Sequence, residues 1–270
     1  MNRKKLTVAY SPCPNDTFMF HDIAMKKLVL PRYHVDVHMH DVEMLNTMAL
    51  SETFDITKLS LHAYLKVRDQ YQILNSGAAL GYGCGPLVVT REERAIENLT
   101  QGTIAIPGEL TTAHLLFQLW TPDAGNIVFM PFDQIMGAVI SGDVDVGVVI
   151  HEGRFVYREL GLRCLADLGE WWQERTDLPL PLGCIAARKS LGPSVIDSFD
   201  QLLRQSIENA SAAPDKTFAY VRQHAQEIDE SVFVKHIKTY VNEFSIDLGA
   251  AGREAIKTME EEAVKAGVLK

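Results

Sequence analysis

The chain has 270 residues, of which 47% are hydrophobic and 23% are charged, so it carries enough apolar material for one large or two medium-sized folded units. Its formal net charge of −9 argues against a general surface for nucleic acid or for an anionic membrane. No run of about 18 uninterrupted apolar residues occurs, and the apolar run after the basic N-terminus is too short for a signal peptide. We therefore expect a cytoplasmic protein with no nucleic-acid or membrane partner.

Short apolar runs alternate with helical patterns up to about Arg188, which is typical of a mostly parallel sheet with crossover helices. From Val195 onward only helical patterns are found. The expected strands cover residues 6–10, 35–40, 55–59, 86–90, 103–106, 127–130, 144–150 and 182–188. The expected helices cover residues 17–27, 42–51, 61–67, 112–120, 132–141, 195–212, 214–227, 231–244 and 250–266.

Three segments place polar residues where a predicted strand gives way to a helix. Helix N-termini offer free N–H groups and a positive dipole end, so they suit carboxylates. Residues of this kind from both halves of a cleft would clamp a small acidic molecule. The alternative is that each hydroxyl is an ordinary helix cap and that the lysine is solvated or paired with a carboxylate. The candidates are Asn15 and Asp16 in the first segment, Lys58 and Ser60 in the second, and Thr111 and Thr112 in the third.

Two strand candidates form a pair, because Gly85–Arg91 and Pro181–Arg188 both follow Gly/Pro-rich lead-ins and both end in arginine. A self-contained βα pattern lies between them. We predict that they cross between two lobes, with residues 1–88 and 186–270 forming lobe 1 and residues 89–185 forming an inserted lobe 2. Paired hinge strands would leave a cleft between the lobes, where ligands usually bind.

The segment from Asp145 to Glu152 is the most informative one in the chain. Its uncharged, mostly β-branched residues indicate a strand buried on both faces, and the run ends on His151 and Glu152. In open α/β sheets, ligands lie beyond the carboxyl ends of the strands. A histidine there is suited to proton transfer, because its ordinary pKa is about 6.5. The alternative is that His151 only begins a loop.

The cysteines and most histidines carry weaker signals. Cys13, Cys84, Cys164 and Cys184 are scattered without a CxxC pair, so neither a disulfide framework nor a zinc site is expected, although Cys13 and Cys84 lie in loop-like contexts that suggest exposure. The chain has no P-loop, GxGxxG, GxSxG or HExxH motif, and we expect no metal and no cofactor. A metal pair among His34, His38 and His40 remains an alternative, whereas surface or packing positions are expected for His62, His114, His224 and His236.

The adjacent tryptophans Trp171 and Trp172 are expected in the core of the second lobe. In the alternative, one of them, or Tyr157, forms a wall of the cleft against a flat aromatic ligand.

Taken together, these segments resemble the 1,4-dihydroxy-6-naphthoate synthase family, which acts on cyclic dehypoxanthine futalosine in the futalosine route to menaquinone. The resemblance runs in collinear order from about residue 5 to 265, and several of its motifs are long and unusual. Its motifs are Ser11–Phe18 (SPCPNDTF), Thr57–Ser60 (TKLS), Gly85–Val89 (GPLVV), Pro107–Gly108 with Thr111–Ala113, Ile150–Phe155 (IHEGRF), Trp171–Trp172, Leu178–Gly183 (LPLPLG) and Thr239–Ser245 (TYVNEFS).

The resemblance implies an α/β, two-lobed type II periplasmic-binding-protein-like fold with a helical C-terminal region, used as a lyase that needs no cofactor. The implied reaction converts cyclic dehypoxanthine futalosine, a small acidic aromatic substrate, to 1,4-dihydroxy-6-naphthoate with release of dihydroxyacetone. The implied catalytic base is His151, oriented by Glu152 or a neighbouring carbonyl, and Glu109 is expected to point away from the cleft. The implied substrate-binding residues are Lys58, Leu59, Ser60, Thr111 and Thr112, with a less defined role for Asn15 and Asp16.

Two other functions compete with this one. A binding protein of the same fold would hold a small acid without reacting with it, and chorismate dehydratase is a sister enzyme of related fold in the same pathway. The His151–Glu152 segment together with the Ser11–Asp16 loop favours the naphthoate synthase. We expect a monomer or a homodimer. Contacts of Arg154, Arg188 or Tyr157 with substrate are left open.

Overall fold

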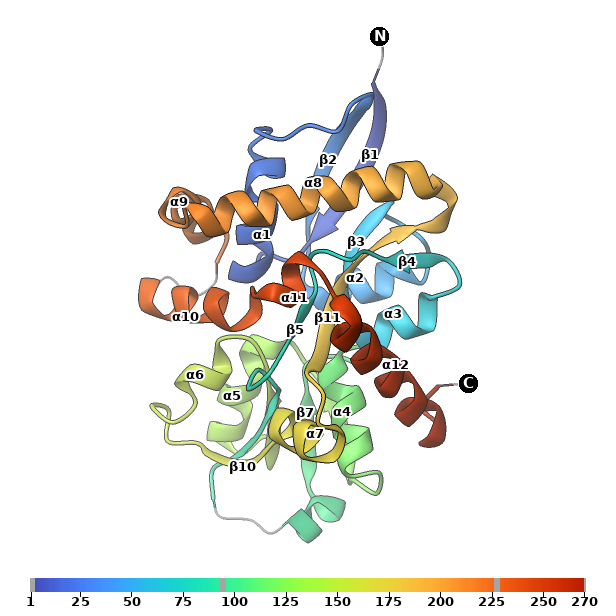
Figure 1. The fold of residues 1–270 in the computed structure, drawn as a ribbon. Coiled ribbons are helices and arrows are strands. Elements are labelled where there is room, and N and C mark those ends of the chain that lie inside the picture. Colours follow the sequence, from blue (N-terminus) through green and yellow to red (C-terminus); the bar gives the residue numbers. More distant parts are fainter. Residues whose placement is uncertain (1–2, 93–95, 226–228, 270) are drawn as a thin grey trace.

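The computed structural model describes residues 3–92, 96–225 and 229–269, and they build two sheets with helices on their faces (Figure 1). The first sheet has the strand order β2-β1-β3-β11-β4, with β5 also paired to β11, and the second has the order β10-β6-β9-β7-β8. The strands are β1 (Lys4–Tyr10), β2 (Tyr33–Met39), β3 (Ile56–Ser60), β4 (Tyr71–Ile73), β5 (Ala79–Gly81), β6 (Leu87–Thr90), β7 (Thr103–Ile106), β8 (Asn126–Phe129), β9 (Val146–Val149), β10 (Arg163–Asp167) and β11 (Leu180–Arg188).

The helices that follow the strands pack on both sheets. They are α1 (Pro14–Ala24), α2 (Val42–Ala49), α3 (Leu61–Val67), α4 (Thr112–Trp120), α5 (Phe132–Ser141), α6 (Gly153–Val156) and α7 (Leu168–Thr176). The C-terminal region consists of α8 (Pro193–Ala212), α9 (Asp215–His224), α10 (Glu230–Tyr240), α11 (Glu243–Ile246) and α12 (Gly249–Lys265). Short 3₁₀ turns at Ile96–Gln101 and Lys189–Leu191 complete the described elements.

The two-lobed α/β architecture is confirmed, but the expectation of mostly parallel sheets is wrong. Strand β11 runs antiparallel to β3, β4 and β5, and β6 runs antiparallel to β9 and β10. These strands lie at or next to the points where the chain crosses between the lobes. They therefore enter a sheet in the direction opposite to that of the strands in the βα units. The strands β4, β5 and β10 and the helices α6 and α7 were not predicted. The strands β4 and β5 have three residues each and take their positions from pairing with β11.

The crossing between the lobes differs in detail from the prediction. In the structure β5 pairs with β11, with Leu80 opposite Pro181, whereas β6 lies entirely in the second sheet (Figure 1). Gly85 lies between β5 and β6, where a Cβ atom would come within 2.2 Å of the Gly169 backbone nitrogen. Glycine is therefore required for the start of α7 to approach the crossing chain. The bounds proposed for the two lobes remain a prediction.

The helical tail packs mainly on the first lobe, as expected, but its last helix reaches further. Helices α8 and α9 cover α1, and α12 lies against β11 and α4 (Figure 1). Met259 and Ala263 of α12 are buried in one cluster with Trp172 and Leu116 of the second lobe. Trp172 is fully buried, which confirms its core position. The helix expected over 231–244 breaks after Tyr240, where Asn242 caps α11. Residues 226 and 227, the last two of the helix expected over 214–227, lie outside the described residues.

A close approach of α5 to β9 positions the strand that leads to His151. A Cβ atom on Gly147 would lie 2.5 Å from Cγ2 of Ile135 and 2.9 Å from Cγ2 of Val139. We expect Gly147→Ala to lower the free energy of unfolding by about 1–3 kcal/mol through overpacking, measured by urea denaturation. Gly137→Ala on α5 is the matched control, because nothing lies within 4 Å of its added Cβ and alanine favours the helix. Equal stability changes in the two variants would contradict the packing argument.

Candidate active site

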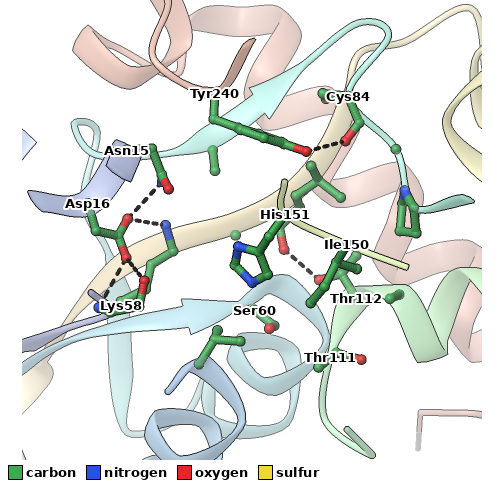
Figure 2. A pocket seen from close by; sticks show the side chains of 18 of the residues that line it. Asn15, Asp16, Lys58, Ser60, Cys84, Thr111, Thr112, Ile150, His151 and Tyr240 are labelled. Carbon is green, nitrogen blue, oxygen red and sulfur yellow. Dashed lines mark hydrogen bonds and ion pairs between the residues drawn. The ribbon is translucent and has the colours of Figure 1, made fainter. Parts of the chain in front are cut away.

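A cavity that opens to solvent lies where the carboxyl ends of strands from both sheets face each other (Figure 2). Its wall is built from both lobes and from the helical tail. It is lined by Ser11, Asn15, Asp16, Val42, Lys58, Ser60, Ala79, Cys84, Gly85, Pro86, Thr111, Thr112, Ala113, Ile150, His151, Leu182, Gly183, His236 and Tyr240.

His151 follows β9 and points into this cavity (Figure 2). All four residues of β9 are buried, and the chain then turns at His151 with a positive φ of 54°. A non-glycine residue in this left-handed region carries a conformational cost that is frequently found at functional sites. Burial lowers the pKa of His151, although the nearby negative charges of Glu152, Asp41 and Asp16 oppose the shift. The imidazole is therefore neutral at pH 7 and has a lone pair with which to accept a proton.

The direct partner of His151 is Cys13, not Glu152. The Cys13 Sγ lies 3.2 Å from the His151 Nδ1 and 4.0 Å from its Nε2. Burial and the charge of Asp16 raise the pKa of the Cys13 thiol well above its usual range, so the thiol stays protonated. Glu152 instead has an oxygen 3.9 Å from Nδ1 of His236. Cys84 is buried, so the exposure suggested for it is wrong, whereas Cys13 is half-buried.

A buried ion pair forms one end of the cavity. The Lys58 Nζ donates to the Asp16 Oδ1 at 2.7 Å, and the two side chains are 7% and 0% exposed. The Ser11 hydroxyl donates to Oδ2 of Asp16 at 2.7 Å. Nδ2 of Asn15 donates to Oδ1 of Asp16 at 2.9 Å. The carboxylate of Asp16 is thus fully occupied by donors. Asp16 holds Lys58 and Asn15 in place and has little capacity left for a ligand.

Ser60 is the N-cap residue of α3, but its side chain makes no capping hydrogen bond. Its hydroxyl oxygen accepts from Nδ2 of Asn46 at 3.0 Å, and its backbone N–H donates to Oδ1 of Asn46 at 2.9 Å. Among the described residues the hydroxyl proton has no acceptor, and the side chain lines the cavity. Ser60 can therefore donate a hydrogen bond to a bound molecule.

Thr111 and Thr112 lie at the start of α4, and both line the cavity. The Thr111 hydroxyl caps the helix by accepting from the His114 backbone N–H at 3.2 Å. The Thr112 hydroxyl donates to the carbonyl oxygen of Leu182 at 2.6 Å, across to β11. Both hydroxyls are used inside the protein. The backbone N–H groups of Thr112 and Ala113, which have no carbonyl partner inside a helix, are the groups that this turn offers to an anion.

Leu59 does not line the cavity. Side chains alternate along β3, so Lys58 and Ser60 share the face toward the cavity while Leu59 packs in a core cluster on the opposite face. Several other residues considered for the cleft also lie outside its lining. Arg154 pairs with Asp167, Arg188 pairs with Glu52 and Asp55, Tyr157 and Trp171 pack against core clusters, and Glu109 is exposed.

His236 and Tyr240 are cavity residues that were not predicted. They lie one turn apart on α10, and both are buried. The His236 Nε2 is 3.0 Å from the Asn15 Oδ1, which can only accept, so this nitrogen carries the proton. The ring lies parallel to His151 with centroids 6.0 Å apart. Burial, His151 and Lys58 lower the pKa of His236 far below its usual range, so it too is neutral.

Three other histidines, all outside the cavity lining, have partners within the protein. His38 pairs with Asp36 at 2.9 Å, and His62 and His114 are buried and contact backbone carbonyl groups. Within residues 3–92, 96–225 and 229–269, no three histidine, cysteine or carboxylate side chains are grouped as ligands for one metal ion. In the same part of the chain, no helix combines the length and the apolarity needed to cross a membrane.

The site therefore combines a neutral imidazole with hydrogen-bond donors at some distance from it. Ser60 and the first N–H groups of α4 come from opposite lobes and can hold an anionic oxygen between them. Val42 and Ile150 give part of the lining an apolar surface. This arrangement suits proton removal from a carboxylate-bearing molecule.

Comparison with known proteins gives a consistent picture. The profile of the menaquinone biosynthesis family matches residues 6–265. A 1,4-dihydroxy-6-naphthoate synthase from Streptomyces coelicolor is 44% identical and covers 100% of this chain and 96% of its own. A second, from Thermus thermophilus, is 43% identical and covers 97% of this chain and 95% of its own.

Solved structures show the same fold. A crystal structure of an Archaeoglobus fulgidus protein has a TM-score of 0.93 at 36% identity and covers 98% of both chains. A Candida albicans protein with the generic periplasmic binding protein fold has a TM-score of 0.66 at 14% identity and covers 98% of this chain and 90% of its own. The chain therefore has the periplasmic-binding-protein fold, belongs to the 1,4-dihydroxy-6-naphthoate synthases of the menaquinone biosynthesis family, and is an enzyme of that biosynthesis.

Proposed function

We propose that the cavity binds cyclic dehypoxanthine futalosine and that His151 acts as the general base that starts its cleavage to 1,4-dihydroxy-6-naphthoate and dihydroxyacetone. The observation that carries this proposal is the neutral imidazole of His151 at the end of β9, inside a cavity that is also lined by Ser60 and by the N-terminal residues of α4. The names of the Streptomyces and Thermus relatives support the choice of product.

The chemistry that this proposal requires is a retro-aldol type of fragmentation. His151 removes a proton from a hydroxyl group, and the oxygen of that group becomes a carbonyl as the carbon–carbon bond to the three-carbon fragment breaks. The electron pair of this bond moves into the ring system, which becomes aromatic as a ring oxygen takes up the proton from His151. The Ser60 hydroxyl and the N-terminal N–H groups of α4 hold the substrate carboxylate. Enclosure between the lobes fixes the reacting hydroxyl next to His151, so positioning contributes to the rate along with proton transfer.

Turnover by the purified protein tests the proposal. We expect cyclic dehypoxanthine futalosine to be consumed, with 1,4-dihydroxy-6-naphthoate and dihydroxyacetone formed in equal amounts, as followed by absorbance and mass spectrometry. The same protein is incubated with chorismate as the control. Tight binding of the futalosine without turnover would show a binding protein, and turnover of chorismate alone would show a dehydratase. Either result overturns the proposed reaction.

The proposal also places the enzyme in the cytoplasm and expects it to be a monomer or a homodimer. Size-exclusion chromatography with light scattering on the full chain measures the oligomeric state directly.

A further inference from the structure

A chain of hydrogen bonds connects the second lobe to Ser60. The Leu110 backbone N–H, from the turn before α4, donates to Oε1 of Glu43 at 2.9 Å. The Glu43 Oε2 accepts from Nδ2 of Asn46 at 3.1 Å, and the same amide nitrogen donates to Oγ of Ser60 at 3.0 Å. Glu43 and Asn46 both belong to α2 of the first lobe and lie one turn apart.

The direction of every bond in this chain is determined by the backbone. The Ser60 backbone N–H can only donate, so the atom of Asn46 that it contacts at 2.9 Å is the amide oxygen. The other amide atom is then the NH₂ group, which must donate both to Glu43 and to the Ser60 hydroxyl oxygen. With its oxygen occupied as an acceptor, the Ser60 hydroxyl keeps its proton for the cavity.

Packing shows that this contact between the lobes is close and specific. A Cβ atom on Gly108 would lie 2.4 Å from the carboxyl carbon of Glu43, so the turn that carries Thr111 and Thr112 rests directly on this side chain. Asn46 is fully buried, and Glu43 is half-buried. The chain is complete only while this turn, with Gly108 and Leu110, stays against α2.

We infer that Glu43 and Asn46 are positioning residues that set Ser60 as a hydrogen-bond donor to the substrate carboxylate when the two lobes are closed. The inference rests on the proposed function, because it assigns the carboxylate to the Ser60 end of the cavity. Closure of the lobes brings the N–H groups of α4 to the substrate carboxylate. Through Glu43 and Asn46 it also aligns the Ser60 hydroxyl with the same carboxylate. Both walls of the anion site are thus formed in the same event.

The variant Glu43→Gln tests this inference with little change in shape. Its amide must place an NH₂ group against either Leu110 N–H or the Asn46 amide, so a donor faces a donor and the chain is interrupted. We expect kcat/KM to fall about 5- to 20-fold, mainly through KM, since one hydrogen-bonding pathway to the carboxylate is lost. The control is Glu109→Gln, which removes the same charge from an exposed side chain on the neighbouring turn and should leave kcat/KM unchanged.

A double-mutant cycle with Ser60→Ala separates a positioning role from a general effect on structure. If Glu43 acts through Ser60, Glu43→Gln should lower kcat/KM by less than about 2-fold in the Ser60→Ala background. A loss of the same size in both backgrounds, or no loss in Glu43→Gln, would overturn the inference. Urea denaturation of each variant shows that the comparison is made on folded protein.

Binding of 2-naphthoate, a stable aromatic carboxylate, distinguishes this inference from the proposed reaction. By calorimetry, the wild type should bind it and Glu43→Gln should bind it about 5- to 20-fold more weakly, with the loss again removed in the Ser60→Ala background. This pattern without turnover of the futalosine would support the positioning role and reject the reaction. Turnover combined with additive effects would reject the positioning role alone. A wild type that neither binds 2-naphthoate nor turns over the futalosine would reject both the positioning role and the reaction.

Discussion

Replacing His151 with glutamine is expected to lower kcat by about 10²- to 10⁴-fold, the usual contribution of a positioned general base. Glutamine approximates the size of the imidazole but cannot accept a proton at neutral pH. KM should change little, because the donors at Ser60 and α4 remain in place. Steady-state kinetics with cyclic dehypoxanthine futalosine measure both constants.

The pH dependence gives a second readout for the same residue. A base works in its unprotonated form, and burial lowers the pKa of His151 below its ordinary value of about 6.5. The kcat/KM of the wild type should therefore be constant near pH 7 and fall only as the pH drops through this lowered pKa. The glutamine variant should show no such fall at its residual rate.

His224→Gln is the matched control, because His224 lies on α9 and outside the lining of the cavity. Its kcat and its pH profile should equal those of the wild type. A folded His151→Gln protein with full activity would reject His151 as the base. An unchanged acidic limb in that variant would assign the limb to another group.

The second large effect concerns stability and follows from the ion pair between Lys58 and Asp16. Lys58→Met leaves the carboxylate of Asp16 completely buried without its cation, which typically costs about 3–5 kcal/mol. Asp16→Asn leaves the ammonium group of Lys58 buried without its anion, so a loss of similar size is expected. Urea denaturation at pH 7 with unchanged m-values measures both losses.

The double variant and a surface pair show whether burial is the cause. Lys58→Met combined with Asp16→Asn leaves no unpaired charge, so its loss should be smaller than the sum of the two single losses. Lys257→Met removes an exposed pair with Glu261, whose side chains are 64% and 53% exposed, and should cost about 1 kcal/mol or less. A Lys58→Met protein that loses no more stability than Lys257→Met would contradict this account.

Much of the fold could be predicted from local patterns. The strands β1, β3, β7 and β9 and the helices α3, α4 and α5 lie within a few residues of the expected ranges, because each shows a clear period or a clear helix start. The short strands β4 and β5 could not be predicted, since their positions depend on pairing with β11. The direction of β11 likewise follows from the path between the lobes and has no local signal.

The candidate site divides in the same way. His151, Ser60 and Thr111 stand where a strand ends or a helix begins, and these are features of the sequence itself. Leu59 packs in a core cluster, as the alternation along β3 predicts for a residue between Lys58 and Ser60, and its role in substrate binding stays a prediction. No local pattern indicates that Cys13 contacts His151 or that His236 contacts Asn15, because these partners are distant in sequence.

The sequence by itself determined the lobed α/β fold, the resemblance to the naphthoate synthases and the placement of His151 at the end of a buried strand. These follow from periodicity, chain order and motifs, which are local properties. Only the tertiary structure decided that Cys13 contacts His151 across 138 positions, that His236 meets Asn15 across 221, and that Glu43 links Leu110 to Asn46. Such contacts arise when the two lobes and the helical tail fold onto one another, and each buried polar group then takes whichever partner the packing brings within reach.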